Sequence, residues 1–366
     1  MSAVPHTAPA TALCDDAAAI ALLEELVRIP SISGAERAAV HYLVEQMTAL
    51  GFAAHIDGAG NAVGSVGDGR SEIVLLGHID TVPGGVPVRV VDGRLYGRGA
   101  VDAKGPLAAF VSAVARLNAT GRVRGRLVVI GCVEEEAPSS RGAHYAVEHY
   151  QPDACVVGEP SGWSRVTLGY KGTLRLRCRT TATCGHSAHD RQTAAERMSA
   201  FWQRILEHAT TFNRGRERAF DQLLPTLLQI NSSSDGLREA ATAEISIRLP
   251  LEVVPEFLVD ELHALDALVE LEVLGATPAY QAERNTPLTR ALTRAIRHHG
   301  QQPGFVLKTG TADMNIVGPR WGCPVVAYGP GDAALDHTPD EHIVLDEYLS
   351  SIRVLETALA ELWLQL

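Results

Sequence analysis

A chain of 366 residues is long enough for two domains and a substantial hydrophobic core. Hydrophobic residues make up 46% of it and charged residues 20%, which is ordinary for a soluble globular protein, and no window stays apolar for the length of a membrane span. The formal net charge of -11 argues against nonspecific nucleic-acid binding and against attachment to an anionic membrane.

The amino-terminal residues and the spacing of the cysteines indicate the cellular compartment of the protein. Residues 1–11 lack a basic segment followed by an apolar core, so we expect no secretory signal. The six cysteines are scattered and form no Cys-x-x-Cys pair, which favours buried, reduced thiols over a disulfide framework or a structural zinc knuckle. We therefore expect a cytoplasmic protein.

The first part of the chain alternates helices with short strands. Apolar residues recur at helical spacing over residues 16–27 and 35–50. Residues 72–76 and 126–130 are apolar runs typical of buried strands. Because the alternation continues to about residue 158, the sequence predicts a mostly parallel sheet.

The pattern changes near residue 165, where we predict a second, smaller domain. Residues 166–179 alternate apolar and polar side chains, as a half-exposed strand does. The elements predicted after them are a helix, two strands, a helix and a strand, at residues 193–209, 225–231, 242–249, 255–268 and 269–274. This β-α-β-β-α-β order is the ferredoxin-like unit. We therefore predict an α/β domain (14–165 and 280–366) with an inserted α+β domain (166–279).

Histidine and carboxylate side chains follow the two predicted buried strands and also occupy a glycine-rich turn. His78 and Asp80 come after the first strand, three glutamates at 134–136 come after the second, and Asp102 lies in the turn. Ligands at the carboxyl ends of adjacent strands meet in the usual ligand crevice of an open α/β sheet. A histidine and several carboxylates there can hold two divalent ions, so the sequence predicts a metal-dependent hydrolase.

The spacing suggests a role for each of these residues. Asp80 shares a face with His78 in an extended segment, so it can accept the second imidazole N–H. Consecutive glutamates cannot share one direction, and we expect Glu136 to bind metal and Glu135 to be the general base. A lone His-x-Asp pair is more often structural and a glutamate run more often a solvated face. The joint occurrence of all the segments reverses that preference.

These motifs resemble the di-zinc family of acetylornithine deacetylase, succinyl-diaminopimelate desuccinylase, aminoacylases and glutamate carboxypeptidases. The resemblance covers nearly the whole chain and includes a His-x-Asp strand end, a Gly-x-x-Asp-x-Lys-Gly turn, paired glutamates, a Gly-Glu-Pro segment and a late histidine. It implies that His78 and Glu159 hold one ion, that Glu136 and His337 hold the other, and that Asp102 bridges them. The ions would be Zn²⁺, or else Co²⁺.

The inserted domain resembles the lid and dimerisation domain of that family, which implies a homodimer. By the same resemblance, His186 stabilises the oxyanion, often across the dimer, and Arg248 binds a substrate carboxylate. Asn231 is a further candidate for the substrate pocket. The alternative for Arg248 is a strand arginine that faces solvent, and His189 is best interpreted as a surface histidine.

Residues 308–315 and 327–332 resemble one branch of the family, which releases lysine or ornithine from an amino-group carrier protein. In that branch the α-amine is held in an amide with the side chain of the carrier's C-terminal glutamate, and its release ends lysine or arginine biosynthesis. Lys308 would contact the substrate or support its loop. The alternatives are a deacylase of a free small substrate, such as acetylornithine or succinyl-diaminopimelate, and an inactive relative that binds an amino acid or a partner.

One feature independent of the resemblance suits a protein partner. Arg175, Arg177 and Arg179 lie on one face of a predicted strand, and further arginines follow at 214, 216 and 218. An acidic carrier could be steered to such a patch despite the negative charge of the whole chain. The alternative is an ordinary solvated strand face.

Overall fold

The computed structural model describes residues 14–186 and 191–365, which divide into two compact units. Unit 1 contains the chain up to Leu168, Ala282–Val306 and the chain from Ala312 onward. Unit 2 contains Gly169–Gln281 and Leu307–Thr311. Every helix in the described part of the chain falls short of the length and apolar character that crossing a membrane requires.

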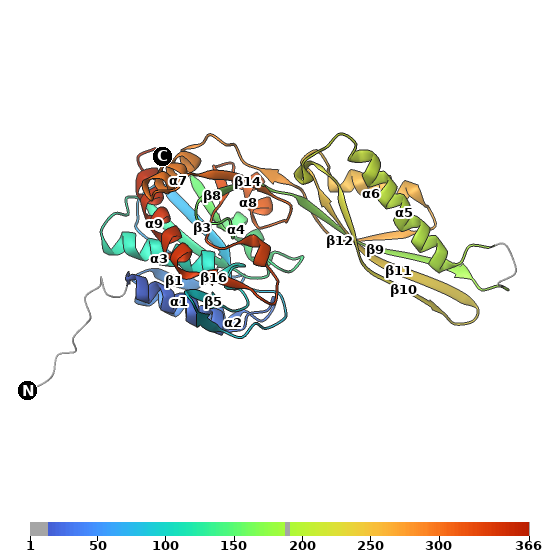
Figure 1. Ribbon diagram of the computed structural model, residues 1–366, viewed down its shortest axis with the longest axis horizontal. Coiled ribbons are helices and arrows are strands. Elements are labelled where there is room, and N and C mark those ends of the chain that lie inside the picture. Colours follow the sequence, from blue (N-terminus) through green and yellow to red (C-terminus); the bar gives the residue numbers. More distant parts are fainter. Residues whose placement is uncertain (1–13, 187–190, 366) are drawn as a thin grey trace, which may run out of the picture. The chain divides into compact units, whose positions relative to one another are not determined.

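Unit 1 is built on one large sheet (Figure 1). In the order in which they pair, the strands of the sheet are β1 (Ala53–Ile56), β2 (Ala62–Val66), β6 (Arg126–Cys132), β3 (Glu72–His78), β7 (Ala154–Gly158), β15 (Val325–Ala327), β8 (Arg165–Tyr170) and β13 (Tyr280–Gln281), with β14 (Gly304–Lys308) also paired to β8. The central strands β6, β3, β7 and β15 are parallel, whereas β1–β2, β2–β6, β15–β8 and β8–β13 are antiparallel pairs. The mostly parallel α/β sheet predicted from the sequence is therefore confirmed.

The two central strands are continuous apolar runs, which is the pattern of a parallel strand covered on both faces. Residues 73–76 of β3 and 127–130 of β6 are fully buried, and each such side chain contributes roughly 1.5–3 kcal/mol on burial. The register sets His78 opposite Cys132, so each strand ends at the same edge of the sheet. The polar segments that follow the two strands therefore begin side by side.

Helices pack against this sheet. They are α1 (Asp16–Arg28), α2 (Arg37–Ala49), α3 (Lys104–Ala119), α4 (Arg141–His149), α7 (Pro287–His298), α8 (Met314–Trp321) and α9 (Leu345–Leu362). Helix α3 is buried along almost its whole length and contacts β3, β6, β7 and α9 (Figure 1). Its second residue is Gly105, where a Cβ would lie 2.4 Å from the carbonyl oxygen of Ala100. This close approach holds the preceding turn against the start of the helix.

A small sheet in unit 1 joins segments that are distant in the sequence. Its strands are β4 (Arg89–Val91), β5 (Arg94–Tyr96) and β16 (His342–Val344), paired in the order β16-β5-β4. Because His342 pairs with Tyr96, the residues next to these two strand ends also meet, and the Gly97 N–H donates to the Glu341 carbonyl oxygen at 3.2 Å.

Unit 2 is a four-stranded antiparallel sheet with two helices. The elements in chain order are β9 (Gly172–Thr183), α5 (Ala194–Phe212), β10 (Leu224–Ser234), β11 (Arg238–Leu249), α6 (Pro255–Leu265) and β12 (Glu270–Thr277). The sheet order is β10-β11-β9-β12. Alternate residues of β9 and β11 are buried in one core with both helices, for example Leu176, Ile245, Phe201 and Leu262. This is the predicted β-α-β-β-α-β unit.

The expectation of one alternating strand over residues 166–179 is wrong. The segment forms two strands, and residues 166–170 of β8 are all buried in the large sheet. The polar residue Thr167 tolerates this burial because its hydroxyl lies 2.8 Å from the Ser161 hydroxyl. The two strands separate at Lys171, whose ammonium donates to the carbonyl oxygens of Ala219, Phe220 and Gln222. True alternation begins only in β9.

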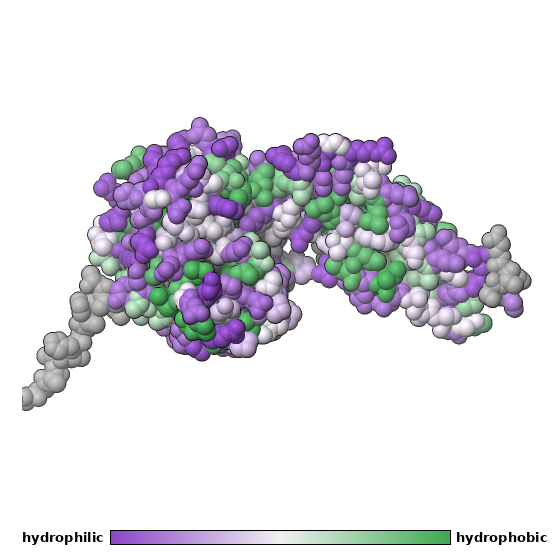
Figure 2. Space-filling model, viewed as in Figure 1, coloured by the Kyte–Doolittle hydropathy of each residue, from purple (hydrophilic) through white to green (hydrophobic). Residues whose placement is uncertain are grey.

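The surface of each unit is largely polar. Figure 2 shows hydrophilic residues over most of the visible face, with smaller groups of hydrophobic residues between them. On unit 2, the edge strands expose apolar side chains, which are Leu228 and Ile230 on β10 and Val273 on β12.

Candidate metal centre

Five predicted ligands and the predicted general base meet at the carboxyl edge of the large sheet. His78 ends β3, Glu135 and Glu136 follow β6, Glu159 follows β7, Asp102 precedes α3, and His337 lies in the loop before β16. Three groups of these side chains place their ligand atoms within 4.8 Å of one another. The groups are His78, Asp102 and Glu159; Asp102, Glu136 and His337; and His78, Glu135 and Glu136.

Asp102 is shared by the first two groups, and its carboxylate faces both. Its Oδ1 atom lies 3.1 Å from Nε2 of His78, and its Oδ2 atom lies 3.1 Å from Nε2 of His337. Glu136 Oε1 lies 2.8 Å from the same nitrogen of His337. A shared carboxylate flanked on each side by an imidazole and a further carboxylate is a donor set suited to two borderline divalent ions such as Zn²⁺.

The carboxylates of this site favour protonated, positively charged forms of the two imidazoles. The carboxylates of Asp102 and Glu136 accept hydrogen bonds from the His337 imidazole and raise the pKa of His337 to about 10. Burial disfavours a charged His78, but the carboxylates of Asp102 and Asp80 outweigh it and raise the pKa of His78 well above its usual value. Burial likewise opposes a charged Asp102, yet the two imidazoles hold its pKa below the usual range. Only neutral imidazoles bind metal, so metal must displace these protons.

Asp80 is fully buried behind the ligands and organises the segment after β6. Its two carboxylate oxygens accept the backbone N–H groups of Glu135 and Glu136, each at 3.0 Å, and one of them also accepts the Ser33 hydroxyl at 2.7 Å. Nδ1 of His78 lies 3.4 Å from the Asp80 carboxylate and 3.1 Å from its carbonyl oxygen. The main-chain oxygen is therefore the nearer partner of the imidazole.

Glu135 shares one of the three groups with His78 and Glu136. Burial raises the pKa of Glu135 well above its usual value, and the nearby carboxylates of Glu159, Asp313 and Glu136 act in the same direction, while His78 opposes them. A carboxyl group with a raised pKa can take up and return a proton near neutral pH.

The carboxylate of Glu134 has partners outside the centre, whereas those of Glu135 and Glu136 belong to one group with His78. Glu134 accepts the Ser139 hydroxyl at 2.6 Å and pairs with Arg141 at 2.8 Å. The backbone at Glu134 has φ of 60° and that at His337 has φ of 62°, values that non-glycine residues rarely adopt. Such backbone outliers cluster at functional sites.

Three buried charged residues near the centre were missed by the sequence reasoning as functional candidates. Glu341 is 0% exposed and accepts the backbone N–H groups of Val101 and Asp102. Lys104 belongs to the Gly-x-x-Asp-x-Lys-Gly motif, and burial lowers its pKa to about 7. Burial raises the pKa of Asp313 to about 7. The only signal in the sequence was the motif lysine.

The remaining predicted site residues belong to unit 2. Arg248 on β11 donates to the Thr311 hydroxyl at 2.8 Å, and that hydroxyl donates to the Lys171 carbonyl at 2.8 Å. The Lys308 ammonium lies 5.7 Å from the centre of the Tyr170 ring. Arg248 and Lys308 are thus attached to the same short loop, Leu307–Thr311.

Asn231 and His186 lie apart from that loop. Asn231 pairs with Thr242, six residues from Arg248 along β11, which is roughly 20 Å at 3.3 Å per residue. It lines a cavity of about 230 Å³ together with Arg177 and Arg179. His186 is exposed, at the end of the segment after β9. His189 lies outside the described residues.

The arginines of β9 share one face of the sheet, as predicted, but their charges are paired. Arg175 and Arg177 pair with Glu244 at 3.2 and 3.0 Å. Arg177 and Arg179 pair with Glu272 at 3.1 and 3.3 Å. The face is therefore a ladder of three cations and two anions, which we call the arginine ladder.

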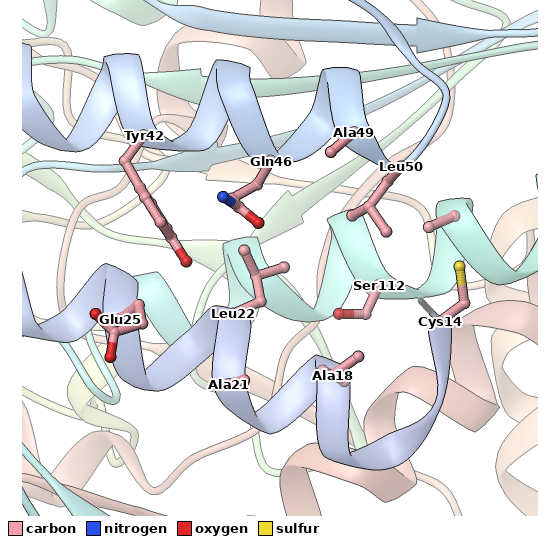
Figure 3. Close-up of a pocket in the computed structure, with 12 residues that line it drawn as sticks. Cys14, Ala18, Ala21, Leu22, Glu25, Tyr42, Gln46, Ala49, Leu50 and Ser112 are labelled. Carbon is pink, nitrogen blue, oxygen red and sulfur yellow. The ribbon is translucent and has the colours of Figure 1, made fainter. Parts of the chain in front are cut away.

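A separate cavity of about 230 Å³ lies between α1, α2 and α3 (Figure 3). Leu22 points into it from α1 and Tyr42 from α2, and Ser112 lines it from α3. None of the predicted site residues lines it.

Comparison with protein families and curated proteins gives consistent matches. A model of the peptidase family M20/M25/M40 matches residues 74–361. A LysW-lysine hydrolase from Deinococcus radiodurans is 45% identical over 356 residues, which are 95% of this chain and 98% of that protein. A LysW-lysine/LysW-ornithine hydrolase from Saccharolobus islandicus is 29% identical over 295 residues, which are 81% of this chain and 82% of that protein.

Solved structures share the fold at low sequence identity. Aminopeptidase PepT from Bacillus cereus matches with a TM-score of 0.76 and 18% identity, over 96% of this chain and 100% of that one. The YXEP protein of Bacillus subtilis, described as a dinuclear metal binding peptidase, matches with a TM-score of 0.69 and 13% identity, over 94% of this chain and 97% of that one. Both likenesses extend over unit 1 and unit 2.

Proposed function

Since the chain belongs to the peptidase family M20/M25/M40, we propose that it is a di-metal hydrolase of amide bonds. The observation that carries this proposal is the Asp102 carboxylate, whose two oxygens each lie 3.1 Å from a different imidazole, those of His78 and His337. A carboxylate in this position could serve as a ligand to two adjacent ions at once, and two-metal sites occur in hydrolases such as aminopeptidases. We propose Zn²⁺ as the ion and Co²⁺ as the alternative, because histidine and carboxylate ligands suit both.

The five proposed ligands would divide between two ions, with Asp102 common to both. One ion would be held by His78, Glu159 and Asp102, and the other by Glu136, His337 and Asp102. Bound ions of this kind supply two things, a coordinated water of lowered pKa and a polarised carbonyl oxygen.

The chain's own residues then move the proton and hold the charges. Glu135 takes a proton from the attacking water and returns it to the leaving nitrogen, so the C–N bond breaks and water adds across it. Asp80 fixes the backbone on which Glu135 is carried. His186 is proposed to donate to the oxyanion, the role that the family resemblance gives it.

We propose that the scissile bond joins the α-amine of lysine to the side chain of a carrier protein's C-terminal glutamate. The support is the LysW-lysine hydrolase name of a relative that is 45% identical over 95% of this chain. Ornithine is the second amine, because a more distant relative is named for both. Arg248 is proposed to bind the α-carboxylate that a lysine amide keeps free, since a guanidinium binds carboxylate in a two-bond fork. Lys308 on the neighbouring loop would support that contact.

The proposed partner is the acidic carrier itself, steered by the arginine ladder of unit 2. A homodimer is proposed as well, since the edge strand β10 exposes Leu228 and Ile230, and an exposed apolar edge invites pairing. The proposed compartment is the cytoplasm, where thiols such as Cys132 and Cys155 stay reduced.

The test is amine release by zinc- and cobalt-loaded protein. Carrier-linked lysine, carrier-linked ornithine and acetylornithine are compared side by side, with Glu135→Gln as the inactive control. Fast release from carrier-linked substrates alone supports the proposal, and the ratio of lysine to ornithine identifies the preferred amine. Preference for acetylornithine would keep the metal mechanism and replace the carrier by a free small substrate. Bound metal with no release from any of the three would refute the proposed substrate class.

A further inference from the structure

Glu341 is a fully buried carboxylate directly behind the metal centre, and both of its oxygens are used. Its Oε1 atom accepts the backbone N–H of Val101 at 3.0 Å and that of Asp102 at 3.2 Å. The turn that carries the shared ligand Asp102 is therefore fixed through its main chain by a side chain from a distant loop.

The second carboxylate oxygen of Glu341 is connected through Arg98 to the loop of His337. Its Oε2 atom accepts from Nη1 of Arg98 at 2.6 Å. Arg98 in turn donates from Nη2 to the His337 carbonyl oxygen at 3.4 Å and from Nε to the Gly84 carbonyl oxygen at 2.9 Å. One ion pair thus connects the main chain of Asp102 with the main chain of His337.

The small sheet explains how these residues reach one another. Glu341 precedes β16 and Arg98 follows β5, and these two strands pair directly. The side chain of Arg98 is 13% exposed, so the pair is largely shielded from water. A buried ion pair of this kind is costly to break because the remaining charge is left without compensation.

We propose that Glu341, acting through Arg98, is a positioning residue that sets the distance between the shared ligand Asp102 and the ligand His337. The inference rests on the di-metal centre proposed above and names what holds its geometry. Ligands whose supporting hydrogen bonds are removed typically lose 10- to 100-fold in metal affinity or activity. The ion held by Asp102, Glu136 and His337 depends on two positioned ligands, so it should be weakened more than its neighbour.

The test measures zinc binding directly, by competition with a chromophoric chelator, on the whole protein without substrate. Glu341→Gln keeps the side-chain shape and an acceptor oxygen but removes the charge that holds Arg98. We expect one of the two zinc dissociation constants to rise about 10- to 100-fold and the other to change less. In a His337→Ala background the same substitution should have a smaller effect, because that ligand is already gone.

Asp266→Asn is the matched control. Asp266 also joins an arginine to a backbone N–H, accepting from Arg204 at 2.9 Å and from the Leu268 N–H at 3.0 Å, but it belongs to unit 2. This substitution should change the melting temperature without changing zinc affinity.

A second variant separates positioning from folding. Glu341→Gln combined with Arg98→Met removes both buried charges, so the melting temperature of the metal-free protein should recover toward that of the unsubstituted protein. Zinc affinity should stay low, because without Arg98 the main chain of His337 is no longer connected to the turn of Asp102. Recovery of affinity together with stability would overturn the inference, as would unchanged zinc binding in Glu341→Gln. Unsubstituted protein that binds no zinc would refute the di-metal centre itself, and this inference with it.

Discussion

The Oδ1 atom of Asp80 lies 3.0 Å from the backbone nitrogen of Glu135 and accepts its hydrogen bond. The same carboxylate accepts the N–H of Glu136 through its other oxygen. Asp80 also contacts His78, whose Nδ1 lies 3.1 Å from the Asp80 carbonyl oxygen. One residue therefore positions the proposed ligand His78 through its main chain and the proposed base Glu135 through its carboxylate.

Replacing Asp80 by asparagine should slow catalysis more than it weakens substrate binding. An amide group keeps one acceptor oxygen, so one of the N–H groups of Glu135 and Glu136 loses its partner. We expect kcat on carrier-linked lysine to fall about 10- to 100-fold with KM nearly unchanged. Ser33→Ala is the control, because it removes a donor to Asp80 and leaves both acceptors in place. An equal loss in the two variants would contradict the assigned role.

Glutamine variants of Glu135 and Glu136 should differ, because Glu135 is the proposed base and Glu136 a proposed metal ligand. Glu135→Gln is expected to lower kcat by about 10²- to 10⁴-fold while zinc binding stays close to normal, since proton transfer needs the carboxylate. Glu136→Gln should lose zinc as well, because Glu136 lies 2.8 Å from His337 in one proposed ion site. Equilibrium dialysis and steady-state rates on both variants decide between the roles. Equal loss of zinc in both would make Glu135 a ligand.

Zinc uptake by the metal-free protein should release protons at pH 8. The pKa of His337 is raised to about 10, so its imidazole is charged at pH 8, and the pKa of His78 is raised as well. Zinc binding requires neutral imidazoles, so at least the proton of His337 should leave. The sign is fixed by the raised pKa, so the release from His337 disappears above about pH 10.

Potentiometric titration in weakly buffered solution measures this release. His337→Gln should release about one proton fewer, since glutamine has none to give. In the metal-free fold, the stabilisation from the charged His337 is fully present below its ordinary pKa of 6.5 and is lost as the pH rises through about 10. Zinc uptake at pH 8 without any proton release would show that the His337 imidazole is already neutral at that pH.

The proposed ligands His78 and Glu136 could be placed at one edge of the sheet from the sequence because each follows an apolar run, whereas Glu159 and His337 were indicated only by the family resemblance. A run such as 73–76 fixes a buried parallel strand, and the strand end fixes the edge of the sheet at which His78 lies. Glu341 gave no such signal. It lies in a loop, 243 residues from its partner Arg98, and an acidic loop residue ordinarily faces water. Only the pairing of β16 with β5 shows that this carboxylate is buried.

The alternation of apolar and polar residues also led to the wrong prediction that β8 is half exposed. Thr167 looks solvent-facing in the sequence, but a buried hydroxyl partner on Ser161 satisfies it. Patterns of polar and apolar residues cannot reveal a hydrogen bond made inside the core. The same holds for Thr311, whose link to Arg248 depends on a loop that is 63 residues away in the chain.

Arg248 and Thr311 should affect the Michaelis constant in proportion to their contact with the substrate carboxylate. Arg248→Met is expected to raise KM about 10- to 100-fold, the loss of a charged hydrogen bond of about 1.5–3 kcal/mol. Thr311→Val removes only the hydroxyl that accepts from Arg248, so a smaller rise is expected. Rates on carrier-linked lysine at several concentrations measure both. A fall in kcat with KM unchanged would place Arg248 outside the substrate pocket.

The arginine ladder should act on the carrier and not on the amino acid. Reversing two of its members, Arg175→Glu with Arg179→Glu, should raise KM for carrier-linked lysine but leave a small acyl-lysine unaffected. Removing the negative charges of the paired glutamates should have the opposite effect. Glu244→Gln with Glu272→Gln leaves the cations unopposed and should lower KM for the carrier. Both effects should shrink in high salt. Equal effects on the two substrates would exclude the ladder as a docking surface.

The short loop Leu307–Thr311 has a consequence for dissecting the protein. The backbone passes between unit 1 and unit 2 not twice, as a simple insertion would, but four times. A fragment cut at residues 169 and 281 would lack the Thr311 hydroxyl that joins Arg248 to the Lys171 carbonyl. Transplanting the segment into a related enzyme would therefore exchange only part of the substrate contacts, and a faithful exchange must carry both segments.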